Sequence, residues 1–158
     1  MSAYIALGAN LAFGELAGSA LLTRALEAVA NHGVPVRAVS SIWLTPAWPP
    51  SVVQPDFHNA AAELDPGART PEQMFAILRA VEQAFGRERR QRWGPRTMDL
   101  DLLSMEGFVG GFGDLELPHP RMHQRRFVLG PLAEIAPNWR HPSLGMTVTE
   151  LLAAAPEH

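Results

Sequence analysis

The sequence contains neither cysteine nor lysine in its 158 residues. The absence of cysteine excludes a disulfide framework, a thiolate nucleophile and a cysteine-based zinc site. The absence of lysine excludes Schiff-base chemistry, the lysine of a Walker-type phosphate loop and the lysine–glutamate pair of protein kinases. All 13 basic residues are therefore arginines, and we expect any anionic ligand to meet guanidinium groups.

Long apolar runs are also missing from the chain. No segment approaches the roughly 20 consecutive apolar residues of a membrane span, and the first residues lack the basic and apolar pattern of a secretory signal. A net charge of −3 argues against a general nucleic-acid binder, which is usually basic. We therefore expect a cytoplasmic protein with no membrane or nucleic-acid partner, in which residues 1–158 form a single domain.

Hydrophobic periodicity predicts a β-α-β-β-α-β order along most of the chain. The predicted strands cover residues 4–7, 34–44, 57–64 and 97–105, and the predicted helices cover residues 16–29 and 71–85. The second helix has the clearer start, because Thr70 and Gln73 form a capping box around Pro71. This order is typical of the α+β, ferredoxin-like fold, in which helices pack on one face of an antiparallel sheet.

The C-terminal third of the chain predicts additions to this core. Residues 106–114 are rich in glycine and indicate a hairpin or turn, and residues 125–132 indicate a short helix. A last helix is expected after Thr147, where Glu150 completes a second capping box. Four histidines are expected at the surface, namely His32, His58, His141 and His158.

Two carboxylates share one face of the strand predicted over residues 97–105. Because strand side chains alternate between faces, Asp99 and Asp101 point the same way while Leu100 points into the core. Carboxylates about 7 Å apart on one face repel unless a cation lies between them. Mg²⁺ is bound in this manner, by one or two carboxylates and the phosphates of a substrate. The alternative is a solvated strand face that carries two ordinary acidic residues.

An arginine-rich segment directly precedes these carboxylates and contains Trp93. Guanidinium forks suit phosphate oxygens, and His119, which lies between two prolines, is a further candidate phosphate contact. The alternatives are an exposed charged loop or an RNA-binding arginine patch with an aromatic side chain on which bases stack. An anion-binding segment next to a candidate Mg²⁺ site favours a binding site for a nucleoside triphosphate. Six of the 13 arginines lie between residues 79 and 96: Arg79, Arg87, Arg89, Arg90, Arg92 and Arg96.

Two segments are candidates for holding an organic substrate. Residues 45–50 are stiffened by prolines, and Trp48 there is expected to form a wall. Phe57 and Asn59 share one face of the next strand, so that an aromatic ring and an amide could meet a heterocycle. Taken alone, Phe57 and Phe127 would both be expected to pack in the core.

Five collinear motifs make the chain resemble the 6-hydroxymethyl-7,8-dihydropterin pyrophosphokinase family of folate biosynthesis. The motifs are YIALGANL at residues 4–11, QPDFHNA at 54–60, GRxRxxRWGPRTxDLDL at 86–102, PHPR at 118–121 and RxFVLxPLxEIAP at 125–137. The resemblance implies a ferredoxin-like fold and a Mg²⁺-dependent enzyme that uses ATP and two Mg²⁺ ions. Such an enzyme transfers pyrophosphate as a unit to the hydroxymethyl group of the pterin and releases AMP.

The resemblance also implies roles for individual residues. Asp99 and Asp101 correspond to the metal-binding carboxylates, and Arg87 and Arg96 correspond to arginines that hold the transferred phosphates. These four residues form the predicted catalytic set. The implied nucleotide contacts are Glu82, Arg89, Trp93, Arg96, Leu102, His119 and Arg125.

The implied pterin site lies in the segments that carry the candidate aromatic rings. Phe57 and Phe127 would sandwich the heterocycle, which replaces the expectation that Phe127 packs in the core. The implied pterin contacts are Thr45, Pro46, Ala47, Trp48, Phe57, Asn59 and Phe127. We expect a monomer whose partners are these two small molecules. Two alternatives stay open, a ferredoxin-like RNA-binding module that uses residues 87–96 and a pterin-binding relative without catalysis.

Overall fold

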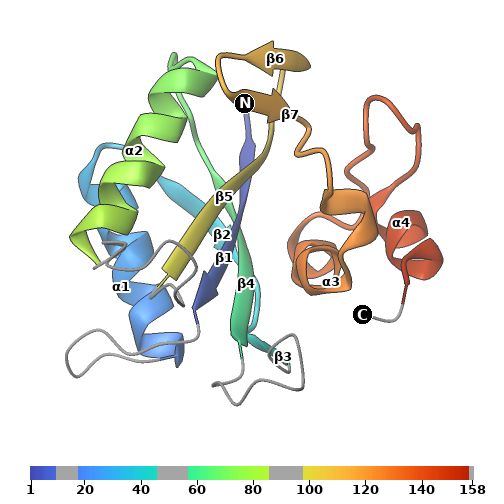
Figure 1. The fold of residues 1–158 in the computed structure, drawn as a ribbon, viewed down its shortest axis with the longest axis horizontal. Coiled ribbons are helices and arrows are strands. Elements are labelled where there is room, and N and C mark those ends of the chain that lie inside the picture. The colour runs from blue at the N-terminus through green and yellow to red at the C-terminus, as the bar shows by residue number, and fades with distance from the viewer. Residues whose placement is uncertain (10–17, 46–56, 86–97, 157–158) are drawn as a thin grey trace.

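The computed structural model describes residues 1–9, 18–45, 57–85 and 98–156, and Figure 1 shows their arrangement. A five-stranded antiparallel sheet has the order β2-β4-β1-β5, and β3 lies along β4. A separate hairpin is formed by β6 and β7. The elements are β1 (Ala3–Ala9), α1 (Gly18–Asn31), β2 (Val36–Val39), β3 (Trp43–Thr45), β4 (Phe57–Leu64), α2 (Pro71–Ala84), β5 (Met98–Met105), β6 (Gly110–Phe112), β7 (Leu115–Leu117), a 3-10 helix (Met122–Gln124), α3 (Arg126–Ile135) and α4 (Val148–Ala154).

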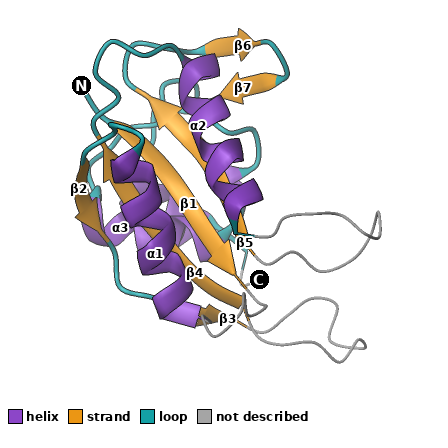
Figure 2. Cartoon of the chain, turned by 90° about the vertical axis from the view of Figure 1, so that its left-hand side faces the viewer, coloured by secondary structure: helices purple, strands orange, loops and turns teal. Residues whose placement is uncertain are grey.

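Helices α1 and α2 cover one face of the sheet and enclose the larger core (Figure 2). Strand β1 alternates strictly, so that Ile5 and Leu7 are buried against these helices. Helix α2 begins at the predicted capping box, in which Thr70 Oγ1 accepts from Gln73 N and the Gln73 side chain accepts from Thr70 N. The predicted α+β class is confirmed, and the predicted β-α-β-β-α-β order is confirmed except that three strands, not two, lie between α1 and α2.

Helices α3 and α4 cover the opposite face and enclose a second core (Figure 1). The sheet contributes Ala61 and Leu103 to this core, and α3 contributes Leu129 and Leu132. Leu102 and Leu103 face opposite sides by ordinary strand alternation. Met105 faces α1 and α2 although Leu103 does not, because the β1–β5 register shifts between Tyr4 and Ile5. Such a bulge changes which residues face each side. The two cores therefore use the two faces of one sheet.

Some predicted elements differ from the structure. The strand expected over residues 34–44 is two strands, β2 and β3, because Ser40 interrupts the ladder with its side chain. Ser40 Oγ accepts from Ala61 N at 2.9 Å and donates to the neighbouring carbonyl of Ser41. The glycine-rich hairpin lies over β6 and β7 rather than over residues 106–114. In the described part of the chain, every helix is too short or too polar to cross a bilayer.

The expected surface position of His141 is wrong. Only 6% of its surface is exposed, and its Nδ1 accepts from the backbone N–H groups of Ser143 and Leu144, both at 3.2 Å. Trp139 packs edge-on against its ring, and Tyr4 packs against Trp139 in turn. The sequence shows no periodic pattern here because His141 lies in a loop, where its ring contacts His123 of the 3-10 helix and Trp139.

Candidate functional site

Asp99 and Asp101 share one face of β5, as the strand alternation predicts, and this face is turned away from α1 and α2. Both carboxylates are partly buried, whereas Met98 and Leu100 are buried in the core on the helix α1–α2 side. On the neighbouring strand β1, Gly8 lies opposite Asp99 and Ala6 lies opposite Asp101. Gly8 and Ala6 therefore place little or no side chain beside the two carboxylates.

Asp101 lies in an environment that disfavours its charge. Burial raises the pKa of Asp101 most, and the charge of Asp99 raises it further. His119 and Arg125 oppose this rise because their positive charges stabilise the carboxylate. The raised pKa of Asp101 indicates repulsion between the two carboxylates, and a cation bound between them would relieve that repulsion.

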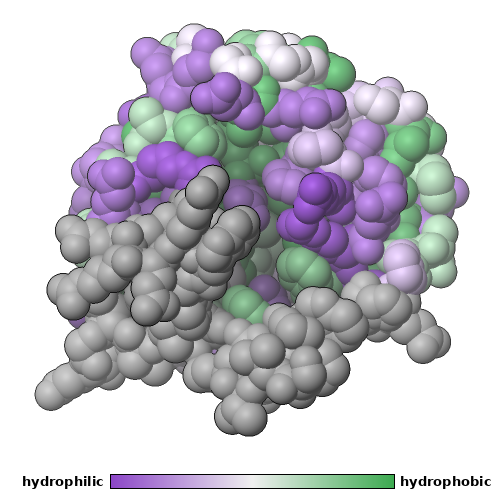
Figure 3. All heavy atoms as spheres, viewed as in Figure 1, coloured by the Kyte–Doolittle hydropathy of each residue, from purple (hydrophilic) through white to green (hydrophobic). Residues whose placement is uncertain are grey.

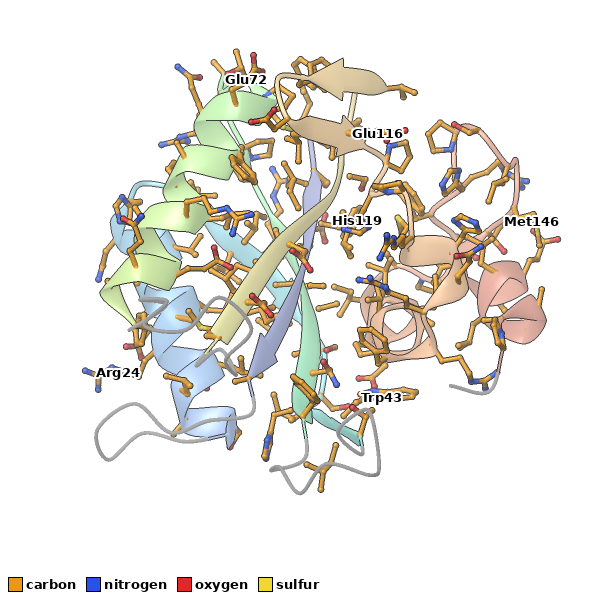
Figure 4. All side chains as sticks on the ribbon, viewed as in Figure 1. Arg24, Trp43, Glu72, Glu116, His119 and Met146 are labelled. Carbon is orange, nitrogen blue, oxygen red and sulfur yellow. The ribbon has the colours of Figure 1, made fainter. Side chains whose placement is uncertain are left out.

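His119 is held beside this pair by its own backbone. Its N–H donates to the carbonyl of Leu103 on β5 at 2.7 Å, and Arg121 N donates to its Nδ1 at 3.2 Å. Figure 4 shows His119 in the region between β5 and α3. Burial lowers the pKa of His119, the charge of Asp101 opposes that change, and Arg125 lowers the pKa further. His119 and Arg125 therefore lie close enough to Asp101 to influence its charge, and their implied nucleotide contacts stay predictions.

Glu82 binds β5 from α2 and is only 1% exposed. Its Oε2 accepts from Leu100 N, between the two aspartates, and its Oε1 accepts from Arg79 Nη1, both at 2.8 Å. Burial raises the pKa of Glu82 to about 7 in spite of the hydrogen bond from Leu100. In the structure the Glu82 carboxylate is hydrogen-bonded to the backbone of β5. Its implied nucleotide contact stays a prediction.

Asn59 continues the row of residues across the sheet. It lies opposite Gly8 on β1, so that Asn59, Gly8 and Asp99 occupy one line over three neighbouring strands. Asn59 is 6% exposed and donates from Nδ2 to Thr45 Oγ1 at 2.8 Å. A Cβ at Gly8 would lie 3.3 Å from Asn59 Oδ1, so the amide oxygen lies over Gly8. We did not single out Gly8 from the sequence, although glycine inside a strand signals close approach.

The two predicted aromatic walls come from different layers of the fold. Phe57 begins β4 opposite Thr45 and is partly buried, whereas Phe127 lies in the first turn of α3 and is 37% exposed. The guanidinium carbon of Arg125 lies 5.7 Å from the centre of the Phe127 ring. Figure 3 shows a hollow on this face between the α2–β5 side and the α3 side. Phe127 is thus available to a ligand and is not a core residue.

Leu102 is placed less favourably for its implied role. Its side chain is 2% exposed and belongs to the core under α1 and α2. Only its backbone, on the same edge of β5 as the Leu100 N–H, remains for a nucleotide. The other predicted site residues lie outside the described part of the chain: Pro46, Ala47, Trp48, Arg87, Arg89, Trp93 and Arg96.

A metal at this site would rest on two protein carboxylates. In residues 1–9, 18–45, 57–85 and 98–156, no group of three or more histidines and carboxylates is arranged to hold a metal ion. Asp99 and Asp101 alone match the small set of protein ligands that Mg²⁺ uses when substrate phosphates complete its coordination. The donor set therefore fits Mg²⁺ bound together with a nucleotide.

Comparison with known proteins identifies the family of the chain. The family described as 7,8-dihydro-6-hydroxymethylpterin-pyrophosphokinase (HPPK) matches residues 4–137. A 2-amino-4-hydroxy-6-hydroxymethyldihydropteridine pyrophosphokinase of Synechocystis is 42% identical over 120 residues, which are 76% of this chain and 60% of the relative. An enzyme of the same name from Methylorubrum extorquens is 41% identical over 152 residues, 96% of this chain and 91% of the relative.

A solved structure extends the likeness to the fold. The crystal structure of Plasmodium falciparum HPPK-DHPS matches with a TM-score of 0.69 at 12% identity, covering 97% of this chain and 43% of that one. At that identity the match concerns the fold alone. The family match and the sequence relatives decide the assignment: the chain belongs to the 7,8-dihydro-6-hydroxymethylpterin-pyrophosphokinase family.

Proposed function

We propose that this protein transfers pyrophosphate from ATP to the hydroxymethyl group of 6-hydroxymethyl-7,8-dihydropterin. The hydroxyl oxygen attacks the β-phosphorus, the bond from that phosphorus to the α-phosphate oxygen breaks, and AMP leaves. The observation that carries the proposal is the row formed by Asn59, Gly8 and Asp99, with Asp101 beside it. One end of the row offers an amide to a heterocycle, and the other offers carboxylates to a cation with phosphates.

The pterin end of the row is organised before a ligand binds. The hydrogen bond to Thr45 fixes the rotamer of Asn59, so its Oδ1 stays over Gly8. An amide oxygen in that place can accept from the N–H groups along a pterin edge. Phe57 and Phe127 supply apolar rings for the faces of the same heterocycle.

At the phosphate end of the row, three segments of the chain would supply charged side chains. Asp99 and Asp101 would hold two Mg²⁺ ions, whose positive charge would offset the negative charge of the phosphates. His119 and Arg125 add positive charge beside Asp101. Arg87 and Arg96 would hold the transferred group, as the family motif implies. Such transfers depend mainly on positioning and charge stabilisation, and we assign no general base.

We further infer a monomer of one catalytic domain over residues 1–158 that works in the cytoplasm. The absence of cysteine fits a reducing compartment. Sedimentation of the purified chain at working concentration tests the monomer, and limited proteolysis tests the single domain.

The decisive experiment identifies the nucleotide product. The chain is incubated with ATP, Mg²⁺ and 6-hydroxymethyl-7,8-dihydropterin, and AMP and ADP are separated by chromatography. We expect AMP and pterin diphosphate in equal amounts, no AMP without the pterin, and no AMP after chelation of Mg²⁺. Formation of ADP would contradict pyrophosphate transfer. RNA binding without Mg²⁺ and without AMP formation would favour the nucleic-acid alternative, and pterin binding without AMP would favour the non-catalytic one.

A further inference from the structure

A second set of residues joins β3 to α3 at the edge of the candidate pterin site. The carboxylate of Glu134 on α3 accepts three hydrogen bonds from the β2–β3 side. Its donors are Ser41 N at 2.9 Å, Ser41 Oγ at 2.8 Å and Trp43 Nε1 at 2.5 Å. These hydrogen bonds lower the pKa of Glu134, which indicates that they favour its charged form. Trp43 and Glu134 are 91 positions apart in the chain, so only the tertiary fold creates this junction.

Gly130 allows the Trp43 ring to approach α3 closely. A Cβ on Gly130 would lie 2.4 Å from Cη2, 2.5 Å from Cζ3 and 2.9 Å from Cζ2 of Trp43. All three atoms belong to the six-membered ring of the indole. The helix could not carry even an alanine here without moving Trp43 or α3. Figure 4 shows Trp43 at β3, below α3 in this view.

The junction shares its supports with the two walls of the candidate pterin site. Phe127, Gly130 and Glu134 are spaced three and four residues apart, so they lie along one face of α3. On the other side, Trp43 is paired with Asn59, and Thr45 is paired with Phe57. Because β3 is paired with β4 and Phe127 lies on α3, a change in the separation of β3 from α3 would also change the separation of Phe127 from Asn59 and Phe57.

We propose that Trp43, Gly130 and Glu134 are positioning residues that set the width of the pterin site. They act through Phe127 and Asn59 and do not themselves touch the substrate. Glu134 ties α3 to β3, and the bare backbone at Gly130 lets α3 come close enough for Phe127 to close on a flat heterocycle. The inference rests on the proposed pterin-binding function.

The test uses Gly130→Ala, with Gly111→Ala as the matched control. A Cβ at Gly111 meets nothing within 4 Å, and its backbone does not require glycine. Calorimetry measures the pterin Kd in the presence of Mg²⁺ and a non-transferable ATP analogue, and separately measures the analogue Kd. We expect Gly130→Ala to raise the pterin Kd at least about tenfold, because the overlap with the Trp43 ring must be relieved by moving Trp43 or α3. The analogue Kd should stay within about twofold, and Gly111→Ala should change neither.

A rescue distinguishes positioning from general damage. Phenylalanine lacks the outer ring of the indole, so Trp43→Phe makes room for the Cβ of Gly130→Ala while losing the Nε1–H donor. We expect Trp43→Phe alone to raise the pterin Kd about threefold, the scale of one lost hydrogen bond. The double variant should bind the pterin better than Gly130→Ala does. If Gly130→Ala does not fold, the single variants Trp43→Phe and Glu134→Gln test the same inference. Each should raise the pterin Kd and leave the Kd of the ATP analogue unchanged.

Three results would overturn the inference. They are an unchanged pterin Kd in Gly130→Ala, an equal loss of pterin and analogue binding in folded variants, and a double variant that binds the pterin no better than Gly130→Ala does. Failure of the wild-type chain to bind the pterin would overturn the proposed function, and this inference with it.

Discussion

At the scale of single residues, the site depends on small side chains beside charged ones. Gly8 and Ala6 lie between Asn59 and Ala61 on one side and Asp99 and Asp101 on the other. A larger side chain at Gly8 would meet Asn59 Oδ1 first, because a Cβ there is already 3.3 Å away. The neighbours of Asp99 and Asp101 on β1 thus have small side chains or none.

Asp101→Asn should separate activity from stability. Asparagine keeps the shape but removes a charge that burial and Asp99 disfavour, so we expect the free energy of unfolding without ligands to be unchanged or higher. AMP formation should fall by about 100-fold or more, the scale seen when one charge-stabilising group is removed from a site. Product assays and urea unfolding measure the two effects. The exposed Asp114 gives the matched control, since Asp114→Asn should change neither, and full activity in Asp101→Asn would remove Asp101 from the metal site.

His141 predicts a loss of stability in mild acid. Burial, and then the charge of His123, lower the pKa of His141 below the ordinary value of 6.5. Its stabilising effect is present above that ordinary value, where the ring is neutral and Nδ1 accepts from Ser143 and Leu144. The effect is lost as the pH falls through the lowered pKa, because the unfolded chain binds the proton first.

The check is the free energy of unfolding as a function of pH for the wild type and for His141→Asn. We expect the fall below pH 6.5 to be shallower in the variant. The exposed His32 offers the control, and His32→Asn should follow the wild-type curve. Identical slopes for the wild type and His141→Asn would contradict this account of the loop.

At the scale of elements, α2 and β5 are joined through Glu82. Glu82→Ala leaves the Leu100 N–H without its acceptor, and we expect a loss of about 1–3 kcal/mol of stability together with reduced AMP formation. Glu82→Gln keeps an acceptor and should retain most of the activity. Chemical unfolding and product assays measure these effects, and Glu72→Gln on the exposed side of the same helix is the control.

The same residue predicts a pH dependence of opposite sign to that of His141. Burial raises the pKa of Glu82 from 4.5 to about 7, so the folded state binds more protons in that range. Its contribution therefore falls as the pH rises from 4.5 to above 7. The stability of Glu82→Gln relative to the wild type should increase over this interval. A constant difference between the two proteins would show that Glu82 is not protonated on folding.

Secondary structure was predictable to different degrees along the chain. Helix α2 was predictable because its capping box and apolar stripe are local signals. The division of residues 34–44 was not, since Ser40 interrupts the ladder through a partner on β4 that the local sequence does not reveal. The bulge at Leu103 was missed for the same reason, because it is defined by the register with β1.

At the scale of the whole molecule, two cores share one sheet. Ile5 and Leu100 face α1 and α2, while Ala61 and Leu103 face α3 and α4. Neither core can be lost without exposing a face of the same strands, so the molecule should unfold in one step. Trp43 and Trp139 both lie on the α3 side and report on the second core.

Urea unfolding followed by circular dichroism and by tryptophan fluorescence should therefore give coincident transitions. Leu129→Ala in the second core should shift both curves together and cost about 2–5 kcal/mol, the usual cost of such a cavity. Leu78→Ala in the first core is the matched comparison and should behave in the same way. Two separated transitions would show that α3 and α4 fold independently of the sheet.

The sequence by itself determined the order of elements, the shared face of Asp99 and Asp101, and the family, because these depend on local spacing and on motifs. Only the tertiary structure decided which face α3 covers and which residues meet across strands. Asn59, Gly8 and Asp99 lie far apart in the chain and become neighbours through strand register. Trp43 meets Gly130 and Glu134 because a helix packs over an edge of the sheet. Such contacts come from long-range packing, for which a local pattern carries no signal.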